Sequence, residues 1–237
     1  MKRVIIIGAT SGLGREIALN LQREGWSVAV AGRRVELLKE FAIYEQIDVT
    51  AEDAVEGVER LVEKLGGVDL FVNVAGVGFQ NPTLDPKVEK HTFDINGYGF
   101  VRMIDWAYNY FKREKREGQI AIVSSIAGTK PLGTAVAYSA TKRMQSHYLT
   151  GLAQLARMEG LKIRFTDIRP GFAATDILNP NKHYPMMMSK EYAGRLATEA
   201  ILKKKRVAII DWKFAILTLF WSLIPRCIWE RLTFVKN

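Results

Sequence analysis

Tyr138 and Lys142 lie four residues apart in the segment YSATK, and Ser125 precedes them in SSIAG. If YSATK is helical, this spacing places the phenol and the ammonium on one face, where the cation can stabilise a phenolate. An ordinary tyrosine has a pKa of about 10, too high for acid–base work near neutral pH, and a nearby positive charge lowers it. The pair therefore predicts a tyrosine that gives or takes a proton. The alternative for so short a motif is a solvent-exposed helix face without a chemical role.

Short apolar runs alternate with amphipathic stretches along the chain, as expected for strands and helices in turn. The first unit is a strand at 4–7, a glycine loop, a helix at 13–24 and a second strand at 28–31. The interval 35–48 leaves room for one or two helical turns and a brief third strand. Apolar strands separated by helices predict an α/β doubly wound Rossmann fold in a single domain, with about seven parallel strands covered on both faces. The remaining strands are expected at 69–74, 119–124, 162–168 and 207–210, and the remaining helices at 51–65, 87–113, 137–159 and 189–203.

The chain has 237 residues, of which 48% are apolar, enough for one large core. We expect a Rossmann-fold dinucleotide-binding and catalytic domain over 1–211 and an apolar, basic C-terminal helical extension over 212–237. The four-residue apolar run near the start passes directly into glycines, which indicates a strand and not a signal peptide, so a cytoplasmic location is expected. The single cysteine, Cys227, excludes an internal disulfide, and no cysteine and histidine cluster predicts a metal site.

The formal net charge of +9 is unevenly distributed. Residues 203–237 contain eight basic and two acidic side chains, so +6 of the +9 lies there and the rest of the chain is nearly balanced. A nucleic-acid-binding domain would carry its basic surface on the main body, so we expect no nucleic-acid partner.

Glycines between the first strand and the first helix predict a dinucleotide site. In GATSGLG they allow a sharp turn and a close approach to a pyrophosphate, while the helix N-terminus offers free amides. The alternative is a tight turn that binds nothing. The loop residues are Gly8, Thr10, Ser11, Gly12, Leu13 and Gly14.

The second strand ends in AGRR, without the carboxylate that would bind a ribose 2′-hydroxyl. Arginine accommodates a 2′-phosphate, so we expect NADP(H), with Arg33 as the main phosphate contact and Arg34 as the second. NAD(H) is the alternative cofactor, in which case the arginines only cap a solvated loop.

Together these motifs resemble the short-chain dehydrogenase/reductase family over nearly all of residues 1–211. Asp48 and Val49 in IDVT match the pair that lies against the adenine, and Asn96 in FDINGYG matches the family's active-site asparagine. Two positions depart from the family pattern: Ile7 replaces a common threonine, and Val74 replaces the second asparagine of NNAG. Further matches are Asn73, Ala75 and Gly76 in NVAG after the fourth strand, and Pro170, Gly171 and Thr175 on the nicotinamide side.

The resemblance implies hydride transfer between a nicotinamide and a carbonyl or secondary alcohol. Tyr138 would exchange a proton with the substrate oxygen, and Lys142 would lower its pKa and bind the nicotinamide ribose. Ser125 would hydrogen-bond the substrate oxygen, and Asn96 would position a water that links Lys142 to solvent. The preference for NADP(H) favours reduction. Two other classes stay open: a regulatory protein that senses NADP(H) without turnover, and a membrane-surface scaffold; the complete Ser125, Tyr138 and Lys142 set favours an enzyme.

The segment 171–189 is where the family closes over its substrate. Its apolar residues suggest a small-molecule substrate that is itself apolar, with the methionines either forming a lid or simply packing, and His183 is expected to be a surface or packing residue. The other walls are expected from 78–84 and 129–134. The apolar residues are Phe172, Ile177, Leu178, Met186, Met187 and Met188.

The last apolar segment, Phe214 to Ile224, is eleven residues long before Pro225 and Arg226 interrupt it. Crossing a bilayer core of about 30 Å takes about 20 residues, so this segment is too short to span a membrane. We expect it to contact another subunit in a homo-oligomer, a dimer or tetramer. The alternative is an interfacial helical hairpin in peripheral contact with anionic lipid.

Overall fold

The computed structural model describes residues 1–175 and 184–233. These residues contain one sheet of seven parallel strands, in the order β3-β2-β1-β4-β5-β6-β7. The chain begins in the middle of the sheet, moves outward to β3 and returns to β4, so the strand order reverses between β1 and β4. In open parallel sheets, ligands bind outside the carboxyl ends of the strands at this reversal. The strands are β1 (Arg3–Ile7), β2 (Ser27–Gly32), β3 (Ile43–Gln46), β4 (Leu70–Asn73), β5 (Gly118–Val123), β6 (Ile163–Pro170) and β7 (Val207–Ile210).

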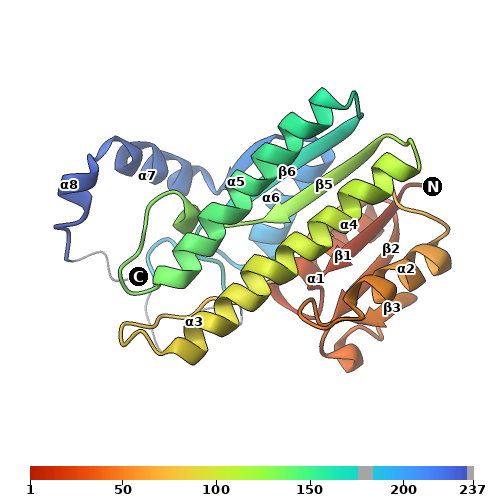
Figure 1. Ribbon diagram of the computed structural model, residues 1–237, viewed down its shortest axis with the longest axis horizontal. Helices are drawn as coiled ribbons and strands as arrows, with labels where there is room; N and C mark the ends of the chain where they lie inside the picture. The colour runs from red at the N-terminus through yellow and green to blue at the C-terminus, as the bar shows by residue number, and fades with distance from the viewer. Residues whose placement is uncertain (176–183, 234–237) are drawn as a thin grey trace.

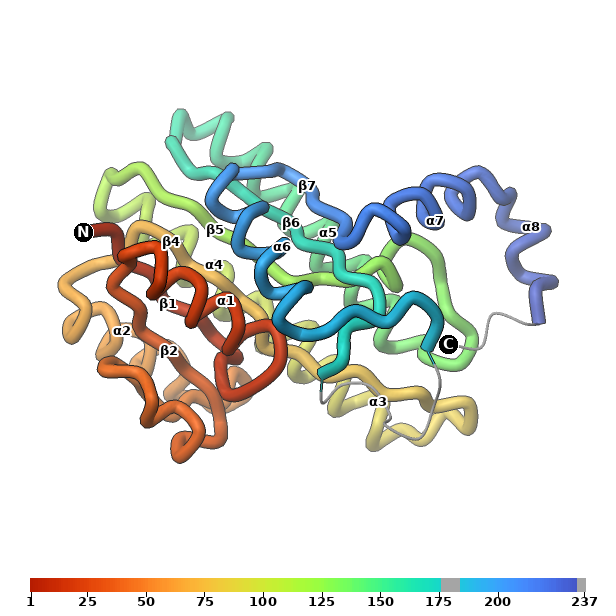
Figure 2. The backbone as a smooth tube through the Cα atoms, turned by 180° about the vertical axis from the view of Figure 1, so that it is seen from behind, coloured from red at the N-terminus to blue at the C-terminus, as the bar shows by residue number. Residues whose placement is uncertain are grey.

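Helices cover both faces of the sheet. α4 and α5 cross the face that is nearer the viewer in Figure 1, and α1 and α6 lie in front of the sheet in the reverse view of Figure 2. The predicted doubly wound Rossmann fold is thus confirmed. The helices are α1 (Gly12–Arg23), α2 (Ala54–Leu65), α3 (Pro86–Phe93), α4 (Phe100–Arg113), α5 (Val136–Met158), α6 (Lys190–Leu202), α7 (Trp212–Leu223) and α8 (Arg226–Trp229), with 3-10 turns at Val35–Leu37 and Ile126–Gly128.

Alternating side chains of the strands supply two separate cores. In β1, Ile5 and Ile7 point to the core beneath α2, α4 and α5, whereas Val4 and Ile6 point to the core beneath α1 and α6. All four are buried. Because both faces of each central strand are covered, the strands are continuous apolar runs, which is why they stand out in the sequence.

One predicted helix differs from the structure. The stretch 87–113 is not a single helix: α3 and α4 are separated by a wider, π-helical turn at Asp94–Gly99. This turn contains Gly97 and Gly99, which stabilise a regular helix poorly, and Gly99 lies directly against the Val49 side chain. The turn places Asn96 inside the molecule, so the interruption has a direct consequence for the candidate site.

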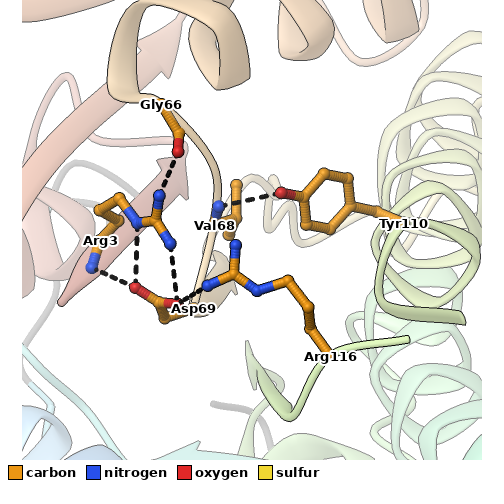
Figure 3. Close-up of polar contacts among 6 residues, drawn as sticks. All are labelled: Arg3, Gly66, Val68, Asp69, Tyr110 and Arg116. Atoms are coloured by element: carbon orange, nitrogen blue, oxygen red, sulfur yellow. Dashed lines mark hydrogen bonds and ion pairs between the residues drawn. The ribbon is translucent and has the colours of Figure 1, made fainter. Parts of the chain in front are cut away.

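Asp69 holds together the amino edge of the sheet, opposite the carboxyl ends of the strands (Figure 3). Asp69 accepts hydrogen bonds from the backbone and guanidinium of Arg3 and from the guanidinium of Arg116, the last at 2.7 Å. Burial would raise the pKa of Asp69, but the hydrogen bonds and charges of the two arginines hold it below its ordinary value. Arg3 also donates to the Gly66 carbonyl, and the Tyr110 hydroxyl accepts from a neighbouring backbone amide. The cluster joins β1, β4 and the α4–β5 connection.

The chain leaves β7 at the carboxyl edge and forms α7 and α8, which project from the body of the molecule (Figures 1 and 2). Asp211 caps α7 by accepting from the Lys213 amide at 3.1 Å. Phe214 is fully buried in the second core. Among residues 1–175 and 184–233, no helix is long and apolar enough to cross a membrane.

Candidate active site

The structure brings Ser125, Tyr138 and Lys142 together at the carboxyl edge of the sheet. Ser125 follows β5 and caps a 3-10 turn by accepting from the Ala127 amide at 3.1 Å. Tyr138 and Lys142 lie one turn apart near the start of α5, and a hydrogen bond joins Tyr138 to Ser125. The Lys142 Nζ lies 5.8 Å from the centre of the Tyr138 ring. The expected arrangement on one helix face is therefore present.

Lys142 is buried, and its ammonium is held by two oxygen acceptors. Its Nζ donates to the Val123 carbonyl and to Oε1 of Gln145, both at 3.1 Å. Burial disfavours the charged form and lowers the pKa of Lys142 to about 8, while the carboxylate of Asp167 acts in the opposite direction. The side chain is thus a buried cation that can lose its proton near neutral pH.

The pKa of Tyr138 differs from the expectation drawn from the four-residue spacing. Burial of the phenol raises the pKa of Tyr138 above its ordinary value, and the hydrogen bond with Ser125 offsets only part of this. The spacing alone did not account for burial, which disfavours the phenolate. In the protein without ligands, Tyr138 therefore keeps its proton and is set up as a donor.

Asn96, the fourth predicted catalytic residue, is fully buried in the π-helical turn. Its Oδ1 accepts from the Val77 amide at 2.8 Å, and its Nδ2 donates to the Val77 carbonyl at 2.7 Å and to the Thr141 hydroxyl at 3.2 Å. These bonds tie the segment after β4 to α5. A Cβ at Gly76 would lie 3.1 Å from Asn96 Oδ1 and 3.2 Å from Lys142 Nζ, so all three predicted positions converge.

The glycine loop forms a compact turn between β1 and α1. Gly8 has a φ of +90°, and a Cβ there would lie 2.5 Å from the Ala75 amide nitrogen. A Cβ at Gly14 would overlap the Gly8 carbonyl. Only glycine permits both approaches, and among the described residues the N-cap Ser11 makes no side-chain cap hydrogen bond, which leaves the start of α1 suited to an anion.

A cleft of about 440 Å³ opens beside this helix N-terminus. β6 ends at Pro170, and Gly171 and the predicted residue Thr175 follow it. The Thr175 Cγ2 lies 3.1 Å from the position that a Cβ on Gly12 would occupy. Leu13 is partly buried against the second core and does not line the cleft. The cleft is lined by Thr10, Ser11, Gly12, Arg15, Ala174, Thr175, Ser189, Lys190 and Glu191.

The two arginines after β2 occupy different places. The Arg34 guanidinium donates to the hydroxyls of Thr10 and Ser11, at 3.2 and 2.9 Å, so it lies against the glycine loop. Arg33 is exposed on the side of Asp48. Burial would raise the pKa of Asp48, but hydrogen bonds from Thr50 and the charge of Arg33 hold it below its ordinary value.

Asn73 ends β4 beside Val74 and Ala75, whose amides both donate to the Ile7 carbonyl. Its side chain is 2% exposed, and neither its Oδ1 nor its Nδ2 has a hydrogen-bond partner among the described residues. An unpaired buried amide costs about 1–3 kcal/mol. Together with the glycine loop and the free helix N-terminus, this group fits a site that is completed by a dinucleotide.

The substrate side is apolar where it is described. Phe172 packs on Tyr184 and on Phe214, with ring centres 5.0 and 6.0 Å apart. Met188 is buried in the second core and therefore packs, whereas Met186 and Met187 are exposed. The segments 78–84 and 129–134 are joined by a bond from the Asn81 amide to the Thr134 carbonyl. Ile177, Leu178 and His183 lie outside the described residues.

Two buried polar groups were missed by the sequence reasoning. Gln145 bridges Lys142 and the Asn96 carbonyl, and Asp167 accepts from Ser124 and pairs with Arg169 at 2.7 Å behind the site. The position of Gln145, three residues after Lys142, was a usable signal because it lies one helical turn away. Asp167 gave no such signal, since Ser124, which donates to it, lies forty-three residues away in the chain.

The model of the short chain dehydrogenase family matches residues 2–184, and the chain belongs to this family. An uncharacterized oxidoreductase of Myxococcus xanthus (strain DK1622) is 30% identical over 243 residues, covering 97% of this chain and 95% of the relative. A short chain dehydrogenase from Burkholderia cenocepacia J2315, solved with NADP, superposes with a TM-score of 0.82 at 20% identity, covering 98% and 99% of the two chains. A family member from Burkholderia phymatum, solved with NAD, gives 0.82 at 18% identity, covering 92% of each chain. These two structures support the fold.

Proposed function

We propose that the protein is an NADP(H)-dependent oxidoreductase that acts on a carbonyl or secondary alcohol. The observation that carries the proposal is the arrangement of Tyr138, hydrogen-bonded to Ser125, with the buried Lys142 ammonium over its ring. A structural tyrosine does not need a buried cation and a hydroxyl partner beside it. A sensor without turnover does not need them either, so an enzyme explains the site better.

Arg34 supports a cofactor with a 2′-phosphate. Its guanidinium lies against the glycine loop, and the two residues directly after β2 are both arginines, without a carboxylate to bind a ribose 2′-hydroxyl. Arginine binds phosphate with two parallel hydrogen bonds, which suits this position. We assign the main phosphate contact to Arg34, with Arg33 on the adenine side near Asp48; Val49, Asn73 and Pro170 to Thr175 complete the cofactor site.

The residues of the site have distinct roles in the reaction. When bound, the nicotinamide supplies or accepts the hydride. Tyr138 donates its proton to the carbonyl oxygen in reduction, and Ser125 donates a hydrogen bond to the same oxygen where negative charge develops. Lys142 stabilises the phenolate that remains, because a positive charge near the phenol favours its ionised form. Reduction is the favoured direction, since the pKa of Tyr138 is raised and the group begins protonated.

The substrate is an apolar carbonyl compound. The half-buried Phe172 packs on the buried rings of Tyr184 and Phe214 after β6, and the exposed Phe79 lies in the segment that 129–134 contacts. Apolar walls with few polar groups fit ligands without fixed charge.

The test is a screen of ketones and aldehydes by loss of NADPH absorbance, with NADH in parallel and with Tyr138→Phe as the key variant. Tyr138→Phe should bind NADPH as the wild type does and lose at least about a hundredfold in kcat, because only the proton donor is removed. Tyr98→Phe, at an exposed tyrosine on the π-helical turn, is the matched control and should keep full activity. Retained activity in Tyr138→Phe contradicts the proposal. NADPH binding without turnover of any carbonyl favours the sensor.

A further inference from the structure

The outward face of α7 is apolar, whereas a surface helix usually exposes polar residues and buries apolar ones. Its polar Thr218 is buried against the body with Phe214, whereas the opposite face is apolar and exposed. At about 100° per residue the exposed residues fall on a single stripe. Exposed fractions run from 47% for Ile216 to 72% for Leu223. The stripe consists of Trp212, Ile216, Leu219, Phe220 and Leu223.

The stripe lies beside the mouth of the candidate site. Phe214, on the inner side of α7, fills the space next to Gly171, where a Cβ would overlap its ring. At the other end of the helix, Trp229 of α8 packs edge-on against Trp221 and donates to the Pro131 carbonyl at 2.8 Å. The helix is thus anchored at both ends to segments that are expected to border the substrate side, and it projects from the body of the molecule (Figure 1).

Exposed basic side chains flank this stripe. Lys213 lies in the first turn of α7, and Arg226 follows the last turn, where it pairs with Glu230 at 2.6 Å. Apolar and aromatic residues flanked by basic ones are typical of helices that lie in the interface of an anionic membrane.

We propose that the outward face of α7 docks on the surface of an anionic lipid bilayer. The basic residues approach the headgroups, and the stripe from Trp212 to Leu223 enters the boundary with the acyl chains. The binding itself does not depend on the proposed enzymatic function.

The test is flotation of the full-length protein with vesicles of phosphatidylcholine alone or mixed with phosphatidylglycerol. The wild type should float with the mixed vesicles, less with phosphatidylcholine alone, and less at high salt. Phe220→Glu should reduce the floated fraction at least tenfold without changing Tm, because Phe220 is exposed. Met158→Glu, at an equally exposed apolar residue at the far end of α5, is the control and should float normally.

Equal flotation of Phe220→Glu and the wild type would overturn the proposal. So would a wild-type protein that does not float but is a dimer or larger in light scattering and becomes monomeric in Phe220→Glu, because a second copy would then cover the stripe. Flotation requires no turnover, so failure of the proposed enzymatic function would be seen separately in the NADPH screen.

A second, independent inference concerns Gln145, which is buried between two groups of the candidate site. Its Oε1 accepts from Lys142 Nζ at 3.1 Å, and its Nε2 donates to the Asn96 carbonyl at 2.8 Å. An ammonium only donates and a carbonyl only accepts, so one orientation of the amide satisfies both bonds. Asn96 was expected to position a water, and its carbonyl is instead bonded to a side chain.

We infer that Gln145 is a positioning residue that holds the Lys142 ammonium beside the Tyr138 ring. The amide bridges α5 to the π-helical turn, and together with the Val123 carbonyl it leaves the ammonium little freedom. This inference rests on the proposed function for its effect on catalysis. The ionisable groups that face Lys142 are Tyr138 on its own helix and Asp167 from β6.

The test compares Gln145→Glu with Gln145→Met by NMR titration of ¹³C-labelled lysine, with Lys142→Met to assign the signal. Gln145→Glu places a carboxylate beside the ammonium and should move the Lys142 titration to higher pH by at least one unit. Gln145→Met has a similar size and should lower kcat at least tenfold with NADPH affinity nearly unchanged. A titration of Lys142 in Gln145→Glu identical to that of the wild type would refute the inference, whether or not a substrate is known. Full kcat in Gln145→Met would also refute it.

Discussion

Replacing Lys142 with methionine should change how the stability of the protein depends on pH. Burial lowers the pKa of Lys142 from 10.5 to about 8 in the folded protein. Between these two values the unfolded chain binds a proton that the folded protein has released, so stability rises with pH. One pKa unit corresponds to about 1.36 kcal/mol, so the wild type should gain about 2 kcal/mol from this group between pH 7 and pH 9.5. Lys142→Met removes the titrating group and should lack this gain.

The assay is urea unfolding of both proteins without nucleotide, followed by circular dichroism at pH 7.0, 8.0, 9.0 and 9.5. The free energy of unfolding of the wild type, minus that of Lys142→Met, should be constant up to about pH 7.5 and then increase by about 2 kcal/mol. Hydrogen bonds lost with the ammonium contribute a constant offset and do not affect the slope. Lys39→Met removes an exposed lysine and controls for general alkaline effects. A difference that stays flat to pH 9.5 would show that the buried lysine keeps an ordinary pKa.

Three further predictions concern other parts of the molecule. Asp69→Asn should lower the free energy of unfolding by about 1–3 kcal/mol at pH 7. Because the pKa of Asp69 is held below its ordinary value, the wild type should lose this advantage as the pH falls below about 4, so urea titrations of the two proteins should converge there. Arg34→Ala should raise KM for NADPH by about 10-fold or more, at about 1.5–3 kcal/mol per charged hydrogen bond, and leave KM for NADH unchanged; equal effects on both cofactors would contradict the phosphate assignment. Gly171→Ala should lower the free energy of unfolding by about 1–3 kcal/mol, measured by urea titration, because the new methyl overlaps the Phe214 ring; an unchanged value would mean that α7 shifts freely.

The strands were predictable because the sheet is buried on both faces. Runs such as Val4 to Ile7 alternate between two cores, so each residue is apolar and the run has no polar interruption. The first helix was predictable because its glycine loop has a local cause: Gly8 and Gly14 are required by backbone contacts within a few residues or with the adjacent strand. Local or repeating causes of this kind leave a signature in the sequence.

Features with several distant causes were not predictable in the same way. The π-helical turn depends on Asn96 bonding to Val77 and Thr141, nineteen and forty-five residues away in the chain. The raised pKa of Tyr138 depends on burial by several elements at once, which the four-residue spacing to Lys142 does not report. Gln145 becomes meaningful only when the Asn96 carbonyl is placed beside it. Spacing identifies candidate residues, while burial decides their protonation states.

The carboxyl edge of the sheet changes from positively charged to apolar along its length. This change determines which kind of ligand group each part can bind. At one end the α1 N-terminus and Arg34 offer exposed positive charge. In the middle Lys142 is a single buried cation. At the far end the half-buried Phe172 packs on the buried ring of Phe214. A phosphate is bound well only at the first end and an apolar group only at the last, because each would be poorly solvated at the other. The proposed nucleotide and apolar substrate would therefore occupy the edge in one order, with their reacting ends meeting at Tyr138.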